Sequence, residues 1–253
     1  MSAPLPSLAV LAGGLATRLG EVARDTPKSL VEVGGEPFLA HQLRLFRRQG
    51  WTRIVLLTGH LGEPIERFVA SRDWGLAVET IRDSAGSAGP GPRGTGGAVR
   101  AALPRLGPRF AVTYGDAYLD EDPRPAWAAF LRSGRPALMV VLHNRGLGGA
   151  SNAEFDGRLV TRHDKATHGL AWIDWGLSFF SVTAFDGWGA TDPWDLSAIT
   201  GHLAAHARLA GHATATRFHE IGGPAGLDAT RLHLAVMAKP DAGSTHSRES
   251  SKS

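Results

Sequence analysis

The sequence contains no cysteine and no long hydrophobic run. The absence of cysteine from all 253 residues excludes disulfides, thiolate metal sites and a cysteine nucleophile. No apolar run approaches the roughly 18 residues that a membrane-spanning helix needs. The first residues also lack the basic segment that opens a secretion signal. From these absences we expect a cytoplasmic protein that does not act at a membrane.

Lysine is also scarce, because 27 residues are basic but only four of them are lysines. The formal net charge is +3, and no run of consecutive basic residues reaches five. A nucleic-acid-binding surface normally shows denser basic clusters, so this pattern argues against nucleic acid as a partner. A mild positive balance suits a small phosphorylated ligand.

Strand-like and helix-like patterns alternate over the first 142 residues. Short apolar runs predict strands at Leu8–Leu11, Ile54–Leu57, Phe110–Thr113 and Ala137–Leu142, and a further strand is expected at Ala77–Ile81. Helical spacing predicts helices at Phe38–Gln49, Pro64–Ala70, Ala98–Leu103 and Pro125–Leu131. The Gly- and Pro-rich segment Ser84–Gly97 predicts a mobile loop. This alternation indicates an α/β protein with a mostly parallel sheet between two helical layers.

The pattern changes after residue 150. Residues Glu154–Thr161 predict a hairpin with a type I′ turn at Asp156–Gly157, and Leu170–Ser181 reads as β-rich. Helices are expected at Ala198–Leu209 and Leu227–Ala238. We expect one domain over residues 1–240, followed by a disordered polar tail at 241–253.

The segment Leu11–Leu30 carries the chemistry that the sequence reveals most clearly. Gly13 and Gly14 follow the first strand, where they let backbone N–H groups approach phosphate oxygens. Arg18 and Lys28 supply two cations near the same strand end, as a triphosphate requires. The segment is not a P-loop, because no Gly-Lys-Ser/Thr follows the glycines, and it lacks the G-x-G-x-x-G dinucleotide pattern.

Three blocks in this region resemble the signature of sugar-1-phosphate nucleotidylyltransferases: LAGGLATRLG from Leu11, TPKSL from Thr26 and VGGEPF from Val33. Ala16 is the one departure, because the family usually has glycine there. The chain is similar to the short, single-domain heptose-1-phosphate guanylyltransferases and muramate-1-phosphate uridylyltransferases. The resemblance implies a Rossmann-like mixed sheet with a small β-rich subregion that binds the sugar.

Later blocks extend the resemblance along the chain. Gly94–Ala98 is similar to the base-recognition loop of the family. Tyr114-Gly-Asp116 resembles the G-D at a strand end of the family, whose aspartate binds magnesium. The block from His219 to Gly222 resembles D-I-G, with Glu220 standing where the family has its second metal carboxylate.

The resemblance implies transfer of a nucleotidyl group from an NTP to a sugar 1-phosphate, with Mg²⁺ as cofactor. A homodimer is compatible with these expectations. Arg18 and Lys28 would be catalytic, and Asp116 and Glu220 would hold the metal. The nucleotide would be bound by Leu11, Ala12, Gly13, Gly14, Thr95, Gly96 and Gly97. The sugar phosphate would be bound by Asn152, Lys165 and Asp174.

Two alternatives stay open at this level. The acceptor could be a non-sugar phosphate such as phosphocholine, for which Trp172 and Trp175 would offer aromatic faces. The chain could also be a binding module that keeps the fold without the chemistry. The presence of Arg18, Lys28 and Asp116 argues against this second alternative.

Overall fold

The computed structural model describes residues 3–14, 26–59, 61–83, 93–146, 150–167, 169–189 and 193–237. Arg18, Ala16 and the tail 241–253 lie outside these ranges, as does most of the predicted loop after Ile81. No helix within the described ranges is long and apolar enough to cross a membrane.

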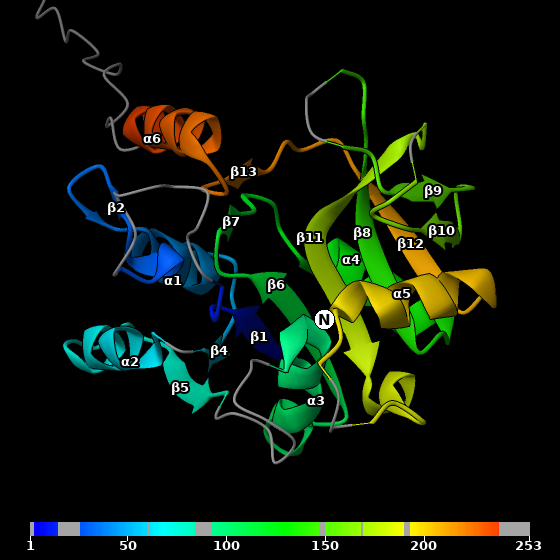
Figure 1. Ribbon diagram of the computed structural model, residues 1–253, viewed down its shortest axis with the longest axis horizontal. Helices are drawn as coiled ribbons and strands as arrows, with labels where there is room; N and C mark the ends of the chain where they lie inside the picture. The colour runs from blue at the N-terminus through cyan, green and yellow to red at the C-terminus, as the bar shows by residue number, and fades with distance from the viewer. Residues whose placement is uncertain are drawn as a thin grey trace, which may run out of the picture.

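A nine-stranded sheet forms the centre of the molecule (Figure 1). Its strands are β1 (Ser7–Leu11), β4 (Arg53–Thr58), β5 (Ala77–Arg82), β6 (Arg109–Tyr114), β8 (Ala137–His143), β9 (Ala153–Phe155), β10 (Val160–His163), β11 (Trp172–Ser181) and β12 (Leu209–Thr214). The main order is β10-β9-β11-β6-β1-β4-β5, and β8 pairs with both β11 and β12.

The half of the sheet that contains β5, β4, β1 and β6 is entirely parallel. Successive residues of β1 face opposite sides, because Leu8 and Val10 join one apolar cluster while Ala9 joins the other. Both faces are therefore covered, which explains why the strand is a continuous apolar run. The carboxyl ends of these strands meet at one edge, where an open α/β sheet binds its ligands.

The other half of the sheet is organised around β11, which runs antiparallel to both β6 and β8. Its pairing with β8 shifts register between Asp174 and Ser178, and Gly176 within this bulge has a φ of +93°. A positive φ of this size is accessible to glycine at little cost, so the bulge depends on this residue.

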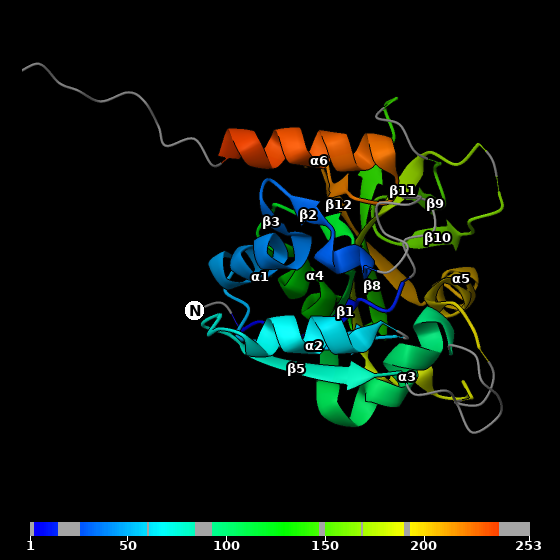
Figure 2. The same cartoon turned by 60° about the vertical axis from the view of Figure 1, so that its left-hand side comes forward.

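Helices cover both faces of the sheet, as Figure 2 shows from the side. One face is covered by α1 (Phe38–Arg48), α2 (Gly62–Ala70) and α4 (Arg124–Ser133), and the other by α3 (Gly94–Leu106) and α5 (Leu196–Ala205). The predicted three-layer α/β/α architecture with a mixed sheet is confirmed.

A smaller unit lies beside the carboxyl edge of β6. It contains the short helix η2 (Lys28–Leu30), the ribbon β2 (Glu32–Val33) and β3 (Glu36–Pro37), the ribbon β7 (Ala117–Tyr118) and β13 (His219–Glu220), and α6 (Pro224–Met237). Its own apolar cluster joins Val33, Phe38, Tyr118, Ile221 and Leu227. The unit thus fixes two segments that are far apart in sequence beside Asp116.

Three predictions about local structure are wrong. The helix expected over Ala198–Leu209 ends at Ala205, and Leu209 begins β12, whose strand conformation is set by parallel pairing with the buried strand β8. The hairpin turn is not type I′, since Gly157 has a positive φ but Asp156 does not. The expected loop extends too far, because Gly94–Gly97 form the first turn of α3.

Candidate active site

A cavity of about 530 Å³ opens at the carboxyl ends of β1, β4 and β6. Residues from six segments line it: Leu11–Gly14, Lys28 and Ser29, Leu57–Gly59, Asp83, Gly94, Thr95 and Ala98, and Tyr114–Asp116. The predicted nucleotide-binding residues Leu11, Ala12, Gly13, Gly14 and Thr95 are among them. Contacts between the strand ends therefore bring the sequence blocks together.

Close backbone contacts set the shape of the cavity floor. A β-carbon on Gly13 would lie 2.9 Å from the backbone nitrogen of Gly59, and one on Gly115 would lie 3.0 Å from Cα of Ala12. Gly14 differs, because a β-carbon there would meet no atom of the described residues within 4 Å. Gly13 is therefore required by packing between strand ends, whereas Gly14 is open to a ligand.

Lys28 and Asp116 form an ion pair on the cavity wall, with 2.5 Å between Nζ and Oδ2. The side chain of Lys28 is 11% exposed and that of Asp116 is 25% exposed, so both are largely shielded from water. Lys28 begins η2 directly after Pro27, and Asp116 lies two residues beyond β6. The pair brings together a predicted catalytic cation and a predicted metal ligand.

Gln42 holds the turn that carries Asp116. It lies on α1, is fully buried, and its Nε2 donates hydrogen bonds to the carbonyl oxygens of Tyr114 (3.2 Å) and Ala117 (2.7 Å). Buried amide donors that bridge two carbonyls fix a turn firmly, because breaking either bond leaves a buried polar group unpaired. The sequence analysis missed Gln42, which there reads as one polar residue in an amphipathic helix.

The block around Gly94 has two roles in the structure. Gly94 and Thr95 line the cavity, at the amino end of α3, where backbone N–H groups favour an anion. Gly96 and Gly97 are buried behind this wall, and a β-carbon on Gly96 would lie 1.8 Å from the Trp194 ring. Gly96 N also donates to Trp194 O. Gly96 therefore packs the helix against a distant segment, whereas a β-carbon on Gly97 would lie 2.7 Å from Cβ of the nearby Arg93.

Glu220 lies near Asp116 but not on the cavity wall. Its backbone pairs with Ala117, and the following residue, Ile221, donates its N–H to the Asp116 carbonyl. The Glu220 side chain is exposed, and a β-carbon on Gly222 would lie 3.1 Å from its Oε1. The backbone of Glu220 thus lies beside the Asp116 turn, whereas its carboxylate lies toward Gly222.

The donor atoms around the cavity suit Mg²⁺ bound mainly by substrate. No group of three His, Asp or Glu side chains that could hold a metal occurs within the described ranges. Mg²⁺ commonly takes one or two protein carboxylates and completes its shell with water and substrate phosphates. Asp116 fits that pattern, because Lys28 occupies Oδ2 and leaves Oδ1 free of that bond.

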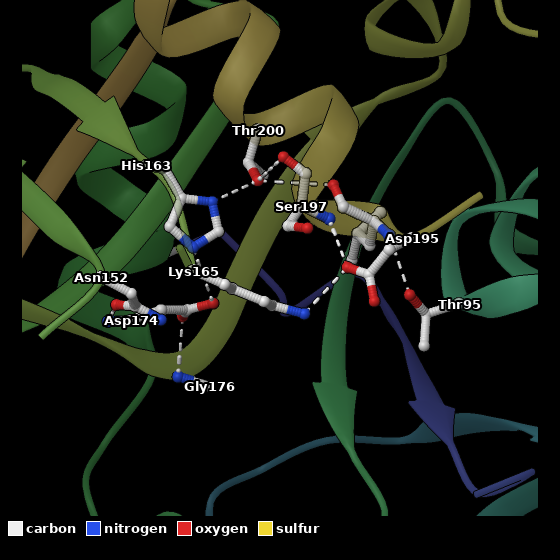
Figure 3. A network of polar contacts seen from close by, with 10 residues as sticks. Thr95, Asn152, His163, Lys165, Asp174, Gly176, Asp195, Ser197 and Thr200 are labelled. Carbon is white, nitrogen blue, oxygen red and sulfur yellow. Dashed lines mark hydrogen bonds and ion pairs between the residues drawn. The ribbon is translucent and has the colours of Figure 1, made fainter. Parts of the chain in front are cut away.

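A second polar cluster lies on the β11 side of the cavity (Figure 3). Asn152 Oδ1 accepts the backbone N–H of Asp174 at 2.8 Å, and Asp174 Oδ1 accepts the N–H of Gly176 at 2.9 Å. Lys165 Nζ is 2.9 Å from Asp195 Oδ1. All three residues predicted to bind the sugar phosphate are therefore in this cluster.

Asp195 connects this second cluster to the first cavity. It caps α5 by accepting the N–H of Ser197, and the N–H of the next residue, Leu196, donates to Thr95 Oγ1 at 2.8 Å. Burial raises the pKa of Asp195, but the hydrogen bonds from Ser197 and the pairing with Lys165 outweigh it and lower the pKa below its usual range. The sequence analysis missed Asp195, although an Asp before a helical run is a typical N-cap.

Tyr114 lies between the two clusters and lines the cavity of each. Burial raises the pKa of Tyr114 well above its usual value, and the nearby carboxylates of Asp174, Asp195 and Asp116 raise it further. The phenol therefore stays neutral at physiological pH.

The two tryptophans proposed to form an aromatic site differ in burial, since Trp175 is buried and Trp172 is half-buried. Trp175 is 3% exposed in the apolar core, and its Nε1 donates to the Thr216 carbonyl. Trp172 packs edge-on against His143 and Phe155, with centroid distances of 4.8 and 5.1 Å. Trp175 therefore cannot contribute to the pair of aromatic faces that a choline-type acceptor would need.

Comparison with known proteins agrees with this geometry. The MobA-like NTP transferase domain matches residues 8–219. Over 77 residues the chain is 35% identical to a probable glucose-1-phosphate cytidylyltransferase of Bacillus subtilis, covering 30% of each protein. Over 113 residues it is 28% identical to the D-glycero-alpha-D-manno-heptose 1-phosphate guanylyltransferase of Campylobacter jejuni, covering 45% of this chain and 48% of that protein. The matched segments thus span less than half of these curated relatives.

Among solved structures, HddC from Yersinia pseudotuberculosis, crystallised with GMP-PN, superposes with a TM-score of 0.74. The match covers 91% of this chain and 100% of HddC at 23% identity, which establishes the shared fold. Because the domain match extends over most of the sequence, this chain belongs to the MobA-like NTP transferase family.

Proposed function

We propose that the chain transfers a nucleotidyl group from an NTP to a sugar 1-phosphate. The observation that carries this proposal is the Lys28–Asp116 pair on the wall of a 530 Å³ cavity, at the sheet edge where open α/β folds bind nucleotides. The relatives named as guanylyl- and cytidylyltransferases of sugar 1-phosphates support the same reaction.

In this reaction an oxygen of the sugar phosphate attacks the α-phosphorus of the NTP. A new oxygen–phosphorus bond forms, the bond to the β-phosphate bridging oxygen breaks, and pyrophosphate leaves. The attacking oxygen is already anionic at neutral pH, so the site needs no general base. Positioning and charge neutralisation then supply most of the rate enhancement.

Each cluster has its own part in this chemistry. Lys28 neutralises the triphosphate, with Arg18 assigned to the leaving pyrophosphate from the sequence resemblance. Asp116 would hold Mg²⁺, which supplies Lewis-acid stabilisation of charge on the phosphates. Lys165, Asn152 and Asp174 would bind the acceptor from the β11 side.

The proposal is tested with a matrix of four NTPs against a panel of sugar 1-phosphates, read by pyrophosphate release with Mg²⁺. We expect one NTP to dominate and turnover to require both substrates. If a folded preparation releases pyrophosphate with none of the substrate pairs, the proposal is wrong. A control without sugar phosphate separates nucleotidyl transfer from NTP hydrolysis. The cytoplasmic location and the homodimer stay predictions.

A further inference from the structure

His163 is a buried histidine that the proposed chemistry leaves unused. It is the last residue of β10, it is 6% exposed, and its Nδ1 lies 2.7 Å from Oγ1 of Thr200 on α5. The other ring nitrogen, Nε2, is buried and receives no hydrogen bond from any described residue. An unpaired buried polar atom costs stability, so it needs a structural or functional explanation, such as a hydrogen bond to a bound water.

The atom that Nε2 faces is Oδ2 of Asp174, in the second polar cluster, which is proposed to bind the acceptor. Asp174 Oδ2 is 4.0 Å away, which is too long for a direct hydrogen bond and suits one bridging oxygen. A small cavity of about 10 Å³ lies here, lined in part by His163, Asp174, Ser197 and Thr200. That volume is close to the minimum of about 10–15 Å³ that one water needs.

Asp174 has only one of its two carboxylate oxygens fixed by the protein. Oδ1 accepts the N–H of Gly176 and thereby belongs to the β11 bulge, whereas Oδ2 lies 4.0 Å from His163 Nε2. An imidazole linked through water would fix the second oxygen, and with it the rotation of the carboxylate. Figure 3 shows the ring of His163 between Thr200 and Asp174.

We propose that His163 is a positioning residue for the acceptor: through one bound water it holds the Asp174 carboxylate in the orientation that binds the sugar. This inference rests on the proposed function, because it assigns Asp174 to the acceptor site. Either neutral tautomer supports the bridge, since water can donate to Nε2 or accept from it while donating to Oδ2. His163 itself does not touch substrate.

Burial of His163 favours the neutral form that this role uses. Burial lowers the pKa of His163, while the carboxylates of Asp174, Asp195 and Asp164 raise it and the ammonium of Lys165 lowers it. Burial has the largest effect, so the ring is neutral at physiological pH. The Thr200 hydroxyl fixes the ring from α5, the helix whose first turn also contacts Thr95.

Two substitutions separate the two ring nitrogens. His163→Asn keeps an amide near the Nδ1 position, so it retains the contact with Thr200 but removes the group facing Asp174. His163→Gln extends an amide to the Nε2 position and can hold the same water. The matched control is His206→Gln, because His206 is an exposed histidine at the end of α5.

We expect His163→Asn to raise the KM for the sugar 1-phosphate about tenfold, with kcat and the KM for the NTP within about threefold of wild type. His163→Gln should stay within about threefold of wild type in all three constants, as should His206→Gln. Wild-type KM values in His163→Asn, or equal losses of kcat and thermal stability in both His163 variants, would overturn the inference.

A second measurement does not depend on activity. A crystal structure of the unliganded protein at high resolution should show one ordered water within hydrogen-bonding distance of both His163 Nε2 and Asp174 Oδ2. Absence of that water, or direct contact between the two side chains, would refute the bridge. If no substrate pair gives pyrophosphate, the proposed function fails, and this structural result still decides whether the bridge exists.

Discussion

The 530 Å³ cavity, proposed to bind the NTP donor, and the second polar cluster, proposed to bind the acceptor, are built in different ways. The donor cavity is formed by short contiguous segments at the ends of parallel strands, and close glycine contacts such as Gly13 against Gly59 define its floor. The acceptor cluster is formed by side chains from β9–β11 and α5 that meet through hydrogen bonds over long sequence distances. Backbone geometry therefore dominates one side and side-chain networks dominate the other.

This difference predicts how each side responds to substitution. A change in a donor-side cation removes charge stabilisation from every substrate and lowers turnover. A change in the acceptor network loosens the positioning of one substrate and raises its KM. The predictions below test that contrast.

The largest effect is expected at the Lys28–Asp116 pair. Lys28→Ala and Asp116→Ala should each lower kcat by on the order of 10²-fold or more, because each removes preorganised charge from the reacting phosphates. Steady-state pyrophosphate release at saturating Mg²⁺ and substrates measures this, with circular dichroism to confirm folding. Near-normal kcat in both variants would place the reaction elsewhere.

Gly96 should show the largest effect on stability. In Gly96→Ala the new β-carbon would lie 1.8 Å from the Trp194 ring. Overpacking of this kind typically lowers the free energy of unfolding by about 1–3 kcal/mol, which exceeds the gain in helix propensity of about 1 kcal/mol. Urea denaturation measures the change, and Gly14→Ala is the control, since its β-carbon meets no atom within 4 Å in the part of the chain that the structure describes.

A double substitution sharpens this test of the contact between Gly96 and Trp194. Trp194→Ala removes the ring that the β-carbon would strike, so Gly96→Ala should destabilise that background less than wild type. Full additivity of the two substitutions would show that the steric conflict with Trp194 is not the cause.

Two substitutions of Asp195 should separate its contribution as the N-cap of α5 from its contribution as the ion-pair partner of Lys165. Asp195→Ala loses both the N-cap and the pair with Lys165, and we expect about 1 kcal/mol of destabilisation from the lost cap. Asp195→Ser keeps a capping oxygen and should restore most of that stability. Both variants should raise the acceptor KM only a few-fold, because an exposed ion pair contributes about 0–1 kcal/mol.

Thermal denaturation and acceptor KM, measured on the same two variants, decide between these roles. If Asp195→Ser is as unstable as Asp195→Ala, capping is not the stabilising contribution. An unchanged acceptor KM in both would remove Asp195 from the positioning of Lys165.

The smallest effect is expected at Glu220. Its carboxylate lies toward Gly222 and does not line the donor cavity. Glu220→Gln should therefore keep kcat within about threefold of wild type, and Glu220→Asp should behave alike, in contrast to Asp116→Asn. A large loss in Glu220→Gln that Glu220→Asp rescues would restore Glu220 as a metal ligand.

The sequence predicted the parallel half of the fold well. The strands around Leu8, Ile54 and Phe110 match the predicted ranges within one residue at each end, because a buried strand is a continuous apolar run. The order of the blocks around Gly13, Lys28 and Asp116 points to the proposed donor cavity because its residues belong to short local segments.

The other half was predicted less well. The helix predicted over Ala198–Leu209 includes the first residue of β12, and no strand is predicted over 210–214, since LAGHAT carries no strong strand signal until it pairs with β8. Gln42, His163 and Asp195 look like ordinary polar residues in sequence. Their roles depend on partners that are 75, 37 and 30 residues away, respectively.

The sequence by itself determined the layered fold, the chemical family and the segments that line the cavity, because each of these follows from local patterns. Only the tertiary structure decided that Gly96 packs against Trp194 and that Asp174 faces His163. It also decided that the Glu220 carboxylate lies toward Gly222. The physical reason is that hydrogen bonds and steric contacts act over a few ångströms in space, whatever the distance along the chain.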